Sequence, residues 1–140
     1  MAVFIDVSAI LAAADMADLN HAAATSWFAR AGEPLLVGAL TLAEADHVLQ
    51  RELGLPASLA LVASVTSGAL RVVPPTEGDL ERAAALMTAA AEHRPRLSDA
   101  LLVAAAERLG IRRVATFDRR PLAVLVPRGA RGERLIDLEP

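Results

Sequence analysis

Short apolar runs alternate with longer segments of helical periodicity along almost the whole chain. Five such runs predict strands, and they lie at residues 2–7, 34–38, 70–74, 112–118 and 133–138. The segments between them predict helices at residues 8–15, 20–32, 41–54, 57–68, 76–94 and 98–110. Because strands that alternate with helices build parallel sheets covered on both faces, this order predicts an α/β fold with a central parallel sheet of four or five strands.

The length of 140 residues suits one domain that spans residues 1–140, and no internal repeat or flexible linker marks a second domain. The chain has no cysteine, which excludes a disulfide framework, a thiolate zinc site and a cysteine nucleophile. Asp6 interrupts the first apolar stretch too early for a secretory signal. No run approaches the roughly 20 apolar residues that cross a bilayer. We therefore expect a cytoplasmic protein with no membrane partner.

The charges are divided unevenly between the two parts of the chain. The net charge is -3, but residues 1–93 carry four arginines against eleven acids, whereas residues 94–140 carry ten arginines against six acids. All fourteen basic residues are arginine, whose planar guanidinium pairs well with phosphate oxygens. The C-terminal excess of arginine is thus compatible with a nucleic-acid partner, although the absence of lysine could equally reflect genome composition.

Four acidic residues stand at strand ends or near helix starts. Asp6 closes the first predicted strand and Asp118 closes the fourth. Glu44 lies in the helix after the second strand, and Asp99 opens the helix before the fourth. Ligands of parallel α/β sheets bind outside the carboxyl ends of the strands, so we expect these acids at one edge of the sheet. Clustered carboxylates stay ionised when a cation lies among them, which predicts a Mg²⁺ or Mn²⁺ site.

Structural explanations exist for three of these acids when each is considered alone. Residues 41–44 fit a capping box, residues 98–99 fit the start of a helix, and residues 118–119 could form an ion pair. Asp6 differs, because a carboxylate at the end of an apolar strand is costly to bury unless it is paired or binds a cation. Taken together, the four acids favour a metal centre of the kind that activates water for phosphodiester cleavage.

The four acidic motifs resemble those of PIN-domain ribonucleases, and most closely those of VapC-type toxins, in their order and in their local context. They are Asp6 in FIDVSAI, Glu44 in TLAEADHVLQRELG, Asp99 in LSDALLVAAAERLG and Asp118 in VATFDRR. The resemblance extends from residue 3 to about residue 126. Thr116 also matches a family position, where a hydroxyl orients a water or a carboxylate. The chain departs from the family at Pro121 and Leu122, where many relatives carry a polar residue and an aromatic one.

This resemblance implies a three-layer α/β/α PIN-like fold and a Mg²⁺- or Mn²⁺-dependent endoribonuclease. It implies that Asp6, Glu44, Asp99 and Asp118 hold the metal and that Thr116 belongs to the catalytic site. It further implies a toxin that forms a homodimer, cleaves cellular RNA, and is inhibited by a cognate VapB-type antitoxin.

Six arginines flank the segments that carry Asp99 and Asp118, which predicts a basic rim around an acidic pocket. They are Arg94, Arg96, Arg112, Arg113, Arg119 and Arg120. They could bind the RNA backbone, lie solvated on the surface, or dock an acidic tail of the antitoxin. Aromatic residues make up only 3% of the chain, so arginines rather than base stacking should provide most of the RNA binding. Trp27 and Phe28 are expected to pack in the core, although an apolar stripe there could receive a partner helix.

Three other functions compete with a toxin. A phosphoacceptor signalling domain also has an acidic Mg²⁺ pocket, but its site requires a lysine and this chain has none. A non-catalytic module that binds RNA or protein is disfavoured, because all four acids are present. A housekeeping RNA-processing nuclease would use the same site, and a small antitoxin-like reading frame immediately upstream would distinguish the toxin from it.

Overall fold

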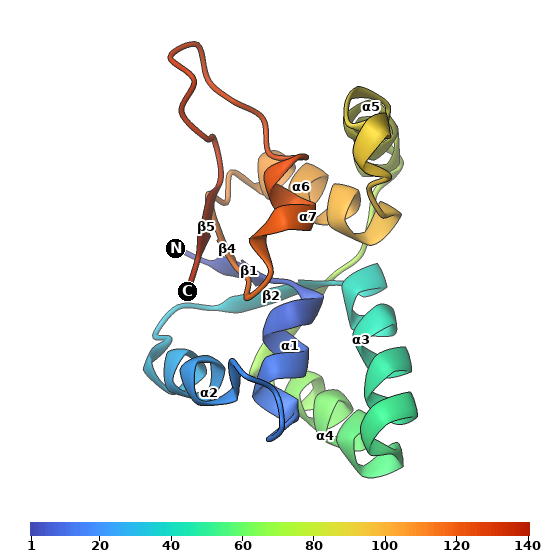
Figure 1. Ribbon diagram of the computed structural model, residues 1–140, viewed down its shortest axis with the longest axis vertical. Coiled ribbons are helices and arrows are strands. Elements are labelled where there is room, and N and C mark those ends of the chain that lie inside the picture. The colour runs from blue at the N-terminus through green and yellow to red at the C-terminus, as the bar shows by residue number, and fades with distance from the viewer.

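Five parallel strands form one sheet in the order β3-β2-β1-β4-β5 in the computed structural model, which describes residues 1–140 (Figure 1). The strands are β1 (Val3–Ile5), β2 (Leu35–Gly38), β3 (Leu70–Val73), β4 (Arg113–Ala115) and β5 (Asp137–Glu139). Phe4 of the central strand pairs with Leu36 on one side and Val114 on the other. The predicted parallel sheet is therefore confirmed, with β5 shorter and closer to the C-terminus than its apolar run suggested.

All six predicted helices are present, together with the short helix α7, which the sequence did not indicate. The helices are α1 (Val7–Ala14), α2 (His21–Arg30), α3 (Ala39–Leu53), α4 (Leu55–Thr66), α5 (Glu77–Ala89), the 3₁₀ helix η1 (Ala91–His93), α6 (Leu97–Leu109) and α7 (Arg119–Ala123). The predicted helix at 76–94 ends its α-helical part at Ala89 and continues as η1. No helix is both long enough and apolar enough to cross a membrane.

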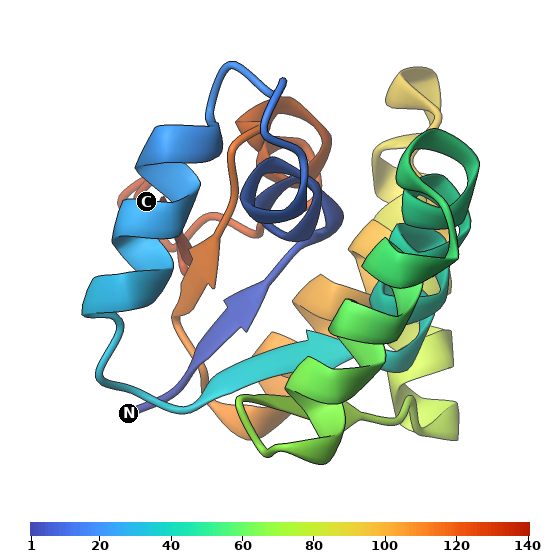
Figure 2. The ribbon, with the colours of Figure 1, turned by 90° about the horizontal axis from the view of Figure 1, so that it is seen from below.

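Helices cover both faces of the sheet, so the chain forms the expected α/β/α layers. Successive residues of a strand point to opposite faces, and Phe4 packs into a core with side chains of α5, α6 and α7. Val3 and Ile5 point the other way, into a second core with side chains of α1 to α4. Figure 1 shows α5, α6 and α7 above the sheet and α1 to α4 below it, and Figure 2 looks onto this lower face.

Trp27 is buried in the lower core, as predicted, and the partly buried Phe28 packs against the same cluster. Their rings meet edge to face, with centroids 5.1 Å apart. This pair places α2 against the sheet beside α1.

The connection from α6 to β4 brings the predicted acids to one edge of the sheet. A helix between parallel strands runs back along the sheet, so its first turn lies near the carboxyl ends of the strands. Ile5 of β1 pairs with Ala115 of β4, which places the residues after both strands side by side.

An ion pair joins the two helices α5 and α6. Asp79 on α5 accepts two hydrogen bonds from Arg108 on α6, of 2.8 and 2.9 Å, and this pair holds the two helices together.

Candidate active site

Asp6 is fixed at the end of β1 by a network of short hydrogen bonds. It is the N-cap of α1, and its Oδ1 accepts a bond from the backbone N–H of Ala9 at 3.0 Å and one from Ser8 Oγ at 2.7 Å. Its Oδ2 lies 2.5 Å from Thr116 Oγ1, a residue 110 positions later. The side chain of Asp6 is buried, with the residue only 5% exposed. Both carboxylate oxygens therefore have partners that orient them toward the loop after β4.

Ser8 links this carboxylate to the loop that carries Asp118. While its hydroxyl donates to Asp6, the oxygen accepts the backbone N–H of Phe117 at 2.8 Å and that of Asp118 at 3.1 Å. Thr116 Oγ1 also lies 2.9 Å from the backbone oxygen of Asp118. Sequence reasoning did not select Ser8. The signal was available in the spacing of Asp6 and Ser8, because a hydroxyl two residues after an N-cap aspartate can bond to its carboxylate.

Asp99 and Glu44 share a guanidinium. Arg96 Nε donates to Asp99 Oδ2 at 3.2 Å, and Arg96 Nη1 forms an ion pair with Glu44 Oε1. The remaining oxygen of Glu44, Oε2, accepts a 2.6 Å bond from Ser98 Oγ. These contacts join α3 to the start of α6, and they account for three of the four oxygens of the two carboxylates.

Asp118 is the most accessible of the four acids, with a side chain that is 46% exposed. Its ion-pair partner is Arg120, at 3.3 Å, rather than the Arg119 that the sequence suggested. The Arg120 side chain is 92% exposed, so water and salt screen this pair and it contributes little to stability. Asp118 is thus free to exchange this partner for another cation.

The buried carboxylates lie close enough to influence one another. Burial raises the pKa of Asp6, and the negative charge of Asp99 adds to this effect, while hydrogen bonds from Thr116, Ser8 and Ala9 oppose it. Burial likewise raises the pKa of Asp99, and Glu44 and Asp118 raise it further against the opposing charge of Arg96. Such mutual repulsion is what a bound cation would relieve.

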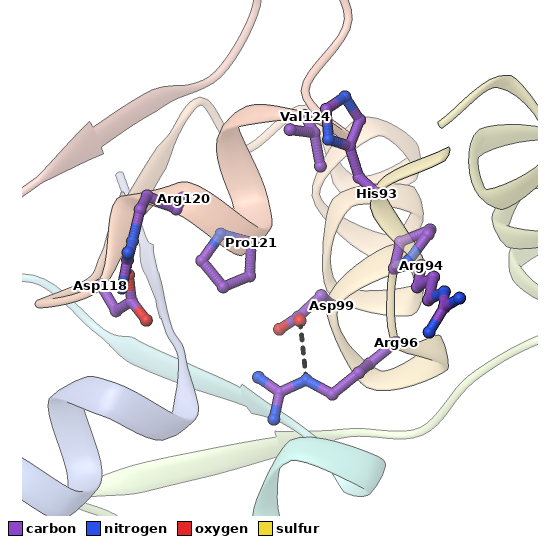
Figure 3. Close-up of a pocket in the computed structure, with 9 residues that line it drawn as sticks. His93, Arg94, Arg96, Asp99, Asp118, Arg120, Pro121 and Val124 are labelled. Atoms are coloured by element: carbon purple, nitrogen blue, oxygen red, sulfur yellow. Dashed lines mark hydrogen bonds and ion pairs between the residues drawn. The ribbon is translucent and has the colours of Figure 1, made fainter. Parts of the chain in front are cut away.

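A cavity of about 410 Å³ opens beside Asp99 and Asp118. Figure 3 shows these two acids on opposite sides of the space, with His93, Arg94, Arg96 and Arg120 around it. Pro121 and Val124 of the α7 region complete the wall. The site therefore combines carboxylates within a hollow and arginines at its margin, an arrangement that suits a polyanion bound next to a cation.

The oxygen donors suit a hard divalent ion, although no three acidic or histidine side chains converge on one point as they stand. Asp6 and Asp99 are buried and their pKa values are raised by burial and by neighbouring carboxylates, so added positive charge would stabilise their ionised forms. Carboxylate oxygens are ligands that Mg²⁺ and Mn²⁺ prefer. The donor set fits such an ion, and the predicted metal site stays a prediction.

The comparisons with known proteins assign the family. The chain matches the PIN domain over residues 3–125. It belongs to the PIN-domain family. Ribonuclease VapC26 of Mycobacterium tuberculosis is 32% identical over 125 residues, which cover 89% of this chain and 93% of that protein.

Solved structures agree with this assignment. VapC20 of Mycobacterium tuberculosis, a toxin that cleaves the sarcin-ricin loop, matches this PIN domain with a TM-score of 0.80 and 26% identity over 86% of this chain and 93% of its own. A toxin-antitoxin complex from Klebsiella pneumoniae matches with a TM-score of 0.64 and 15% identity, covering 86% of this chain and 90% of the matched one, which shows the shared fold.

Two of the six predicted rim arginines lie elsewhere in this PIN domain. Arg113 begins β4 and forms ion pairs with Glu33 and Glu139, the latter at 2.7 Å. Arg112 lines a separate hollow together with Arg71 of β3. A strand advances about 3.3 Å per residue, so residues at the start of β4 lie at the edge of the sheet opposite its carboxyl end. The sequence neighbours of Asp118 were therefore not all its spatial neighbours.

The remaining rim arginines are divided between the cavity and its surroundings. Arg94, Arg96 and Arg120 line the cavity, and Arg119 is exposed at the start of α7. The predicted rim thus keeps three of its six arginines in the cavity wall.

The structural explanations for Glu44 and Asp99 were wrong in detail. Helix α3 begins at Ala39 with Gly38 as N-cap, so Thr41 lies inside the helix and does not form a capping box with Glu44. The N-cap of α6 is Arg96, and Ser98 bonds across to Glu44 instead of capping its own helix.

Proposed function

We propose that this PIN domain is a Mg²⁺- or Mn²⁺-dependent endoribonuclease and the toxin of a toxin-antitoxin pair. The observation that carries the proposal is the electrostatic coupling at the carboxyl edge of the sheet, where the charge of Asp99 acts on Asp6 and those of Glu44 and Asp118 act on Asp99, beside an arginine-lined cavity. Its relatives support the same activity, since VapC26 is named a ribonuclease and VapC20 cleaves an RNA loop. We expect the protein to act in the cytoplasm, on single-stranded or loop RNA.

Asp6, Asp99, Glu44 and Asp118 would hold the metal, which supplies an activated water and stabilises the oxygen that leaves the phosphodiester. The protein's own part is to keep these carboxylates in place before RNA arrives. Thr116 and Ser8 hold Asp6 through hydrogen bonds of 2.5 and 2.7 Å.

The arginines of the cavity wall would bind the phosphates on either side of the cut. Arg94 and Arg120 are exposed and line the cavity that Asp99 and Asp118 flank, so a backbone phosphate can pair with them while the scissile bond faces the acids. We assign Arg119 the same role but expect it to contribute less to RNA affinity, because it lies outside the cavity wall.

We propose that a VapB-type antitoxin binds an apolar groove on the lower face of the sheet, which is the face covered by α1 to α4. This groove, called here the lower groove, has a volume of about 470 Å³, and eleven of its twelve lining residues are apolar, among them Ile10, Phe28 and Leu61. The helix α4 lines this groove with Ala57, Ala60, Leu61 and Ser64, whose spacing places them on one face of the helix. An apolar groove of this kind favours the apolar face of an amphipathic partner helix. The family resemblance also implies a homodimer, which sedimentation equilibrium would test.

Ala60→Glu should weaken antitoxin binding by at least about tenfold, because a carboxylate in the lower groove would lose its hydration without gaining a partner. Ala60 is exposed in the free protein and lines this groove. Ala63→Glu adds the same charge to an exposed position of α4 outside the groove, and is the matched control. The measurement is a binding titration with the cognate antitoxin, which we expect a reading frame immediately upstream to encode. Equal affinities of the two variants would place the antitoxin on another surface.

The toxin proposal is tested by growth of a bacterial host that expresses the protein without an antitoxin. Wild type should arrest growth and deplete intact RNA, whereas Asp6→Asn at equal protein level should be tolerated, because the amide removes a metal-binding charge. Asparagine retains the N-cap acceptor for Ala9, so the folded state should persist. Equal toxicity of both forms would contradict the proposal. Cleavage in vitro by a wild type that leaves growth unaffected would favour the RNA-processing nuclease.

A further inference from the structure

Arg96 is the cation that lies among the candidate metal ligands. It stands in the loop between η1 and α6, and its guanidinium pairs with Asp99 and Glu44 at once. The other rim arginines do not bridge two of the four acids: Arg120 pairs with Asp118 alone, and Arg94 has no carboxylate partner. The position of Arg96 is thus distinct from that of the other cavity arginines.

The oxygens that Arg96 contacts are ones that a metal would need. Its Nε bonds to Asp99 Oδ2 at 3.2 Å and its Nη1 contacts Glu44 Oε1, while Ser98 occupies Glu44 Oε2. A divalent ion that bound both carboxylates would compete with the guanidinium for them, because both are positive and both bind through the same oxygen atoms.

Arg96 is also able to leave. Its side chain is 56% exposed, so it can rotate into solvent without opening the core. It lines the same cavity as Arg94 and Arg120, where the proposed RNA backbone would lie. A released guanidinium would therefore find phosphate oxygens within the same hollow.

We infer that Arg96 is an exchangeable counter-ion, which neutralises Glu44 and Asp99 in the metal-free protein and transfers to an RNA phosphate when a divalent ion takes those carboxylates. This inference rests on the proposed metal-dependent ribonuclease. It makes Arg96 a positioning residue that couples the two ligands: metal binding releases the group that binds RNA, and RNA binding removes the competitor of the metal. Such coupling is reciprocal, and each ligand raises the affinity for the other by the same factor.

The first test compares Mn²⁺ binding to wild type, Arg96→Met and Arg94→Met without RNA, by isothermal titration calorimetry. Arg94→Met removes the same charge from the same cavity wall but breaks no ion pair with an acid. Arg96→Met should bind Mn²⁺ at least about fivefold more tightly than wild type, which is the lower end of typical coupling between sites, and Arg94→Met should change the affinity less than half as much. Equal increases in Mn²⁺ affinity for the two variants would mean that Arg96 acts only through its general positive charge, and this would overturn the inference.

The second test measures binding of a short single-stranded RNA by fluorescence anisotropy, in EDTA and in Ca²⁺, which replaces Mg²⁺ to limit cleavage. In EDTA, wild type and Arg96→Met should bind RNA with similar affinity, because Arg96 is held by the acids. In Ca²⁺, wild type should bind severalfold more tightly than the variant. An equal loss of RNA affinity in both conditions would mean that Arg96 contacts RNA without exchange.

Arg96→Lys keeps the experiment informative if Arg96→Met fails to fold. Lysine retains the charge but lacks the planar fork that bridges two carboxylates. It should therefore bind Mn²⁺ more tightly than wild type, and an affinity equal to that of wild type would overturn the inference. If wild type bound no Mn²⁺ at all, the metal-dependent function and this inference would both fall. If wild type bound Mn²⁺ but the Arg96 and Arg94 variants behaved alike, only the inference would fall.

Discussion

Asp99→Asn is expected to lower the single-turnover rate of RNA cleavage by at least about 100-fold, since losing even an outer-shell partner of a metal site typically costs 10- to 100-fold. Asp99 is buried, borders the cavity, and interacts electrostatically with Glu44 and Asp118. Asparagine keeps the shape and removes the charge. RNA affinity should survive or increase, because the variant repels phosphate less.

Stability distinguishes this loss from a folding defect. Burial raises the pKa of Asp99, so keeping its charge in the folded protein costs free energy, and the neutral amide should be tolerated without a large fall in melting temperature. Glu81→Gln, an exposed change on α5 with the same loss of charge, should retain full activity. Activity of Asp99→Asn within a few-fold of wild type would remove this residue from the metal site.

Chelation is expected to abolish RNA cleavage completely, and Mg²⁺ or Mn²⁺ should restore it. The four carboxylates can polarise water and stabilise a departing oxygen only with a cation among them. The measurement is cleavage of a labelled loop RNA in EDTA, followed by titration with each ion. Full activity in excess EDTA would contradict a metal-dependent mechanism.

The same ions should raise the melting temperature, because they bind the folded site and neutralise Asp6 and Asp99, whose pKa values are raised by burial and further by neighbouring carboxylates. A ligand at 100 times its dissociation constant stabilises a protein by about 2.7 kcal/mol. Asp99→Asn should lose most of this gain, whereas Glu81→Gln should keep it. Equal stabilisation of all three proteins by Mn²⁺ would place the ion at another site.

The Asp6 motif illustrates how far local sequence reasoning reaches. Three apolar residues of β1 end at a carboxylate, which the order of residues shows, whereas the sequence did not predict that Asp6 caps the next helix, because its strand was expected to run to residue 7. Parallel strands bring their carboxyl ends to one edge whatever their side chains do. For this reason, the sequence predicted Asp6 and Asp118 at the same edge of the sheet, and the pairing of β1 with β4 in the structure made them neighbours.

Side-chain contacts between distant parts of the chain did not follow from the sequence. Arg96 and Glu44 are 52 positions apart, and their ion pair depends on how α3 packs beside the start of α6. Ser98 was expected at a helix cap, but the hydroxyl bonds to Glu44 because tertiary packing brings that carboxylate within reach. Arg113 was expected at the acidic pocket, but the direction of β4 carries it to the opposite edge of the sheet.

The sequence by itself thus determined the α/β order, the parallel sheet and the set of acids at its carboxyl edge, because strand and helix periodicity are local and the connection rules are general. The tertiary structure alone decided which groups surround each acid: Ser8 and Thr116 hold Asp6, and Arg96 bridges Glu44 and Asp99. Charged and hydroxyl side chains bond to the unpaired polar groups that lie within hydrogen-bonding distance. These distances are set only when the helices pack on the sheet.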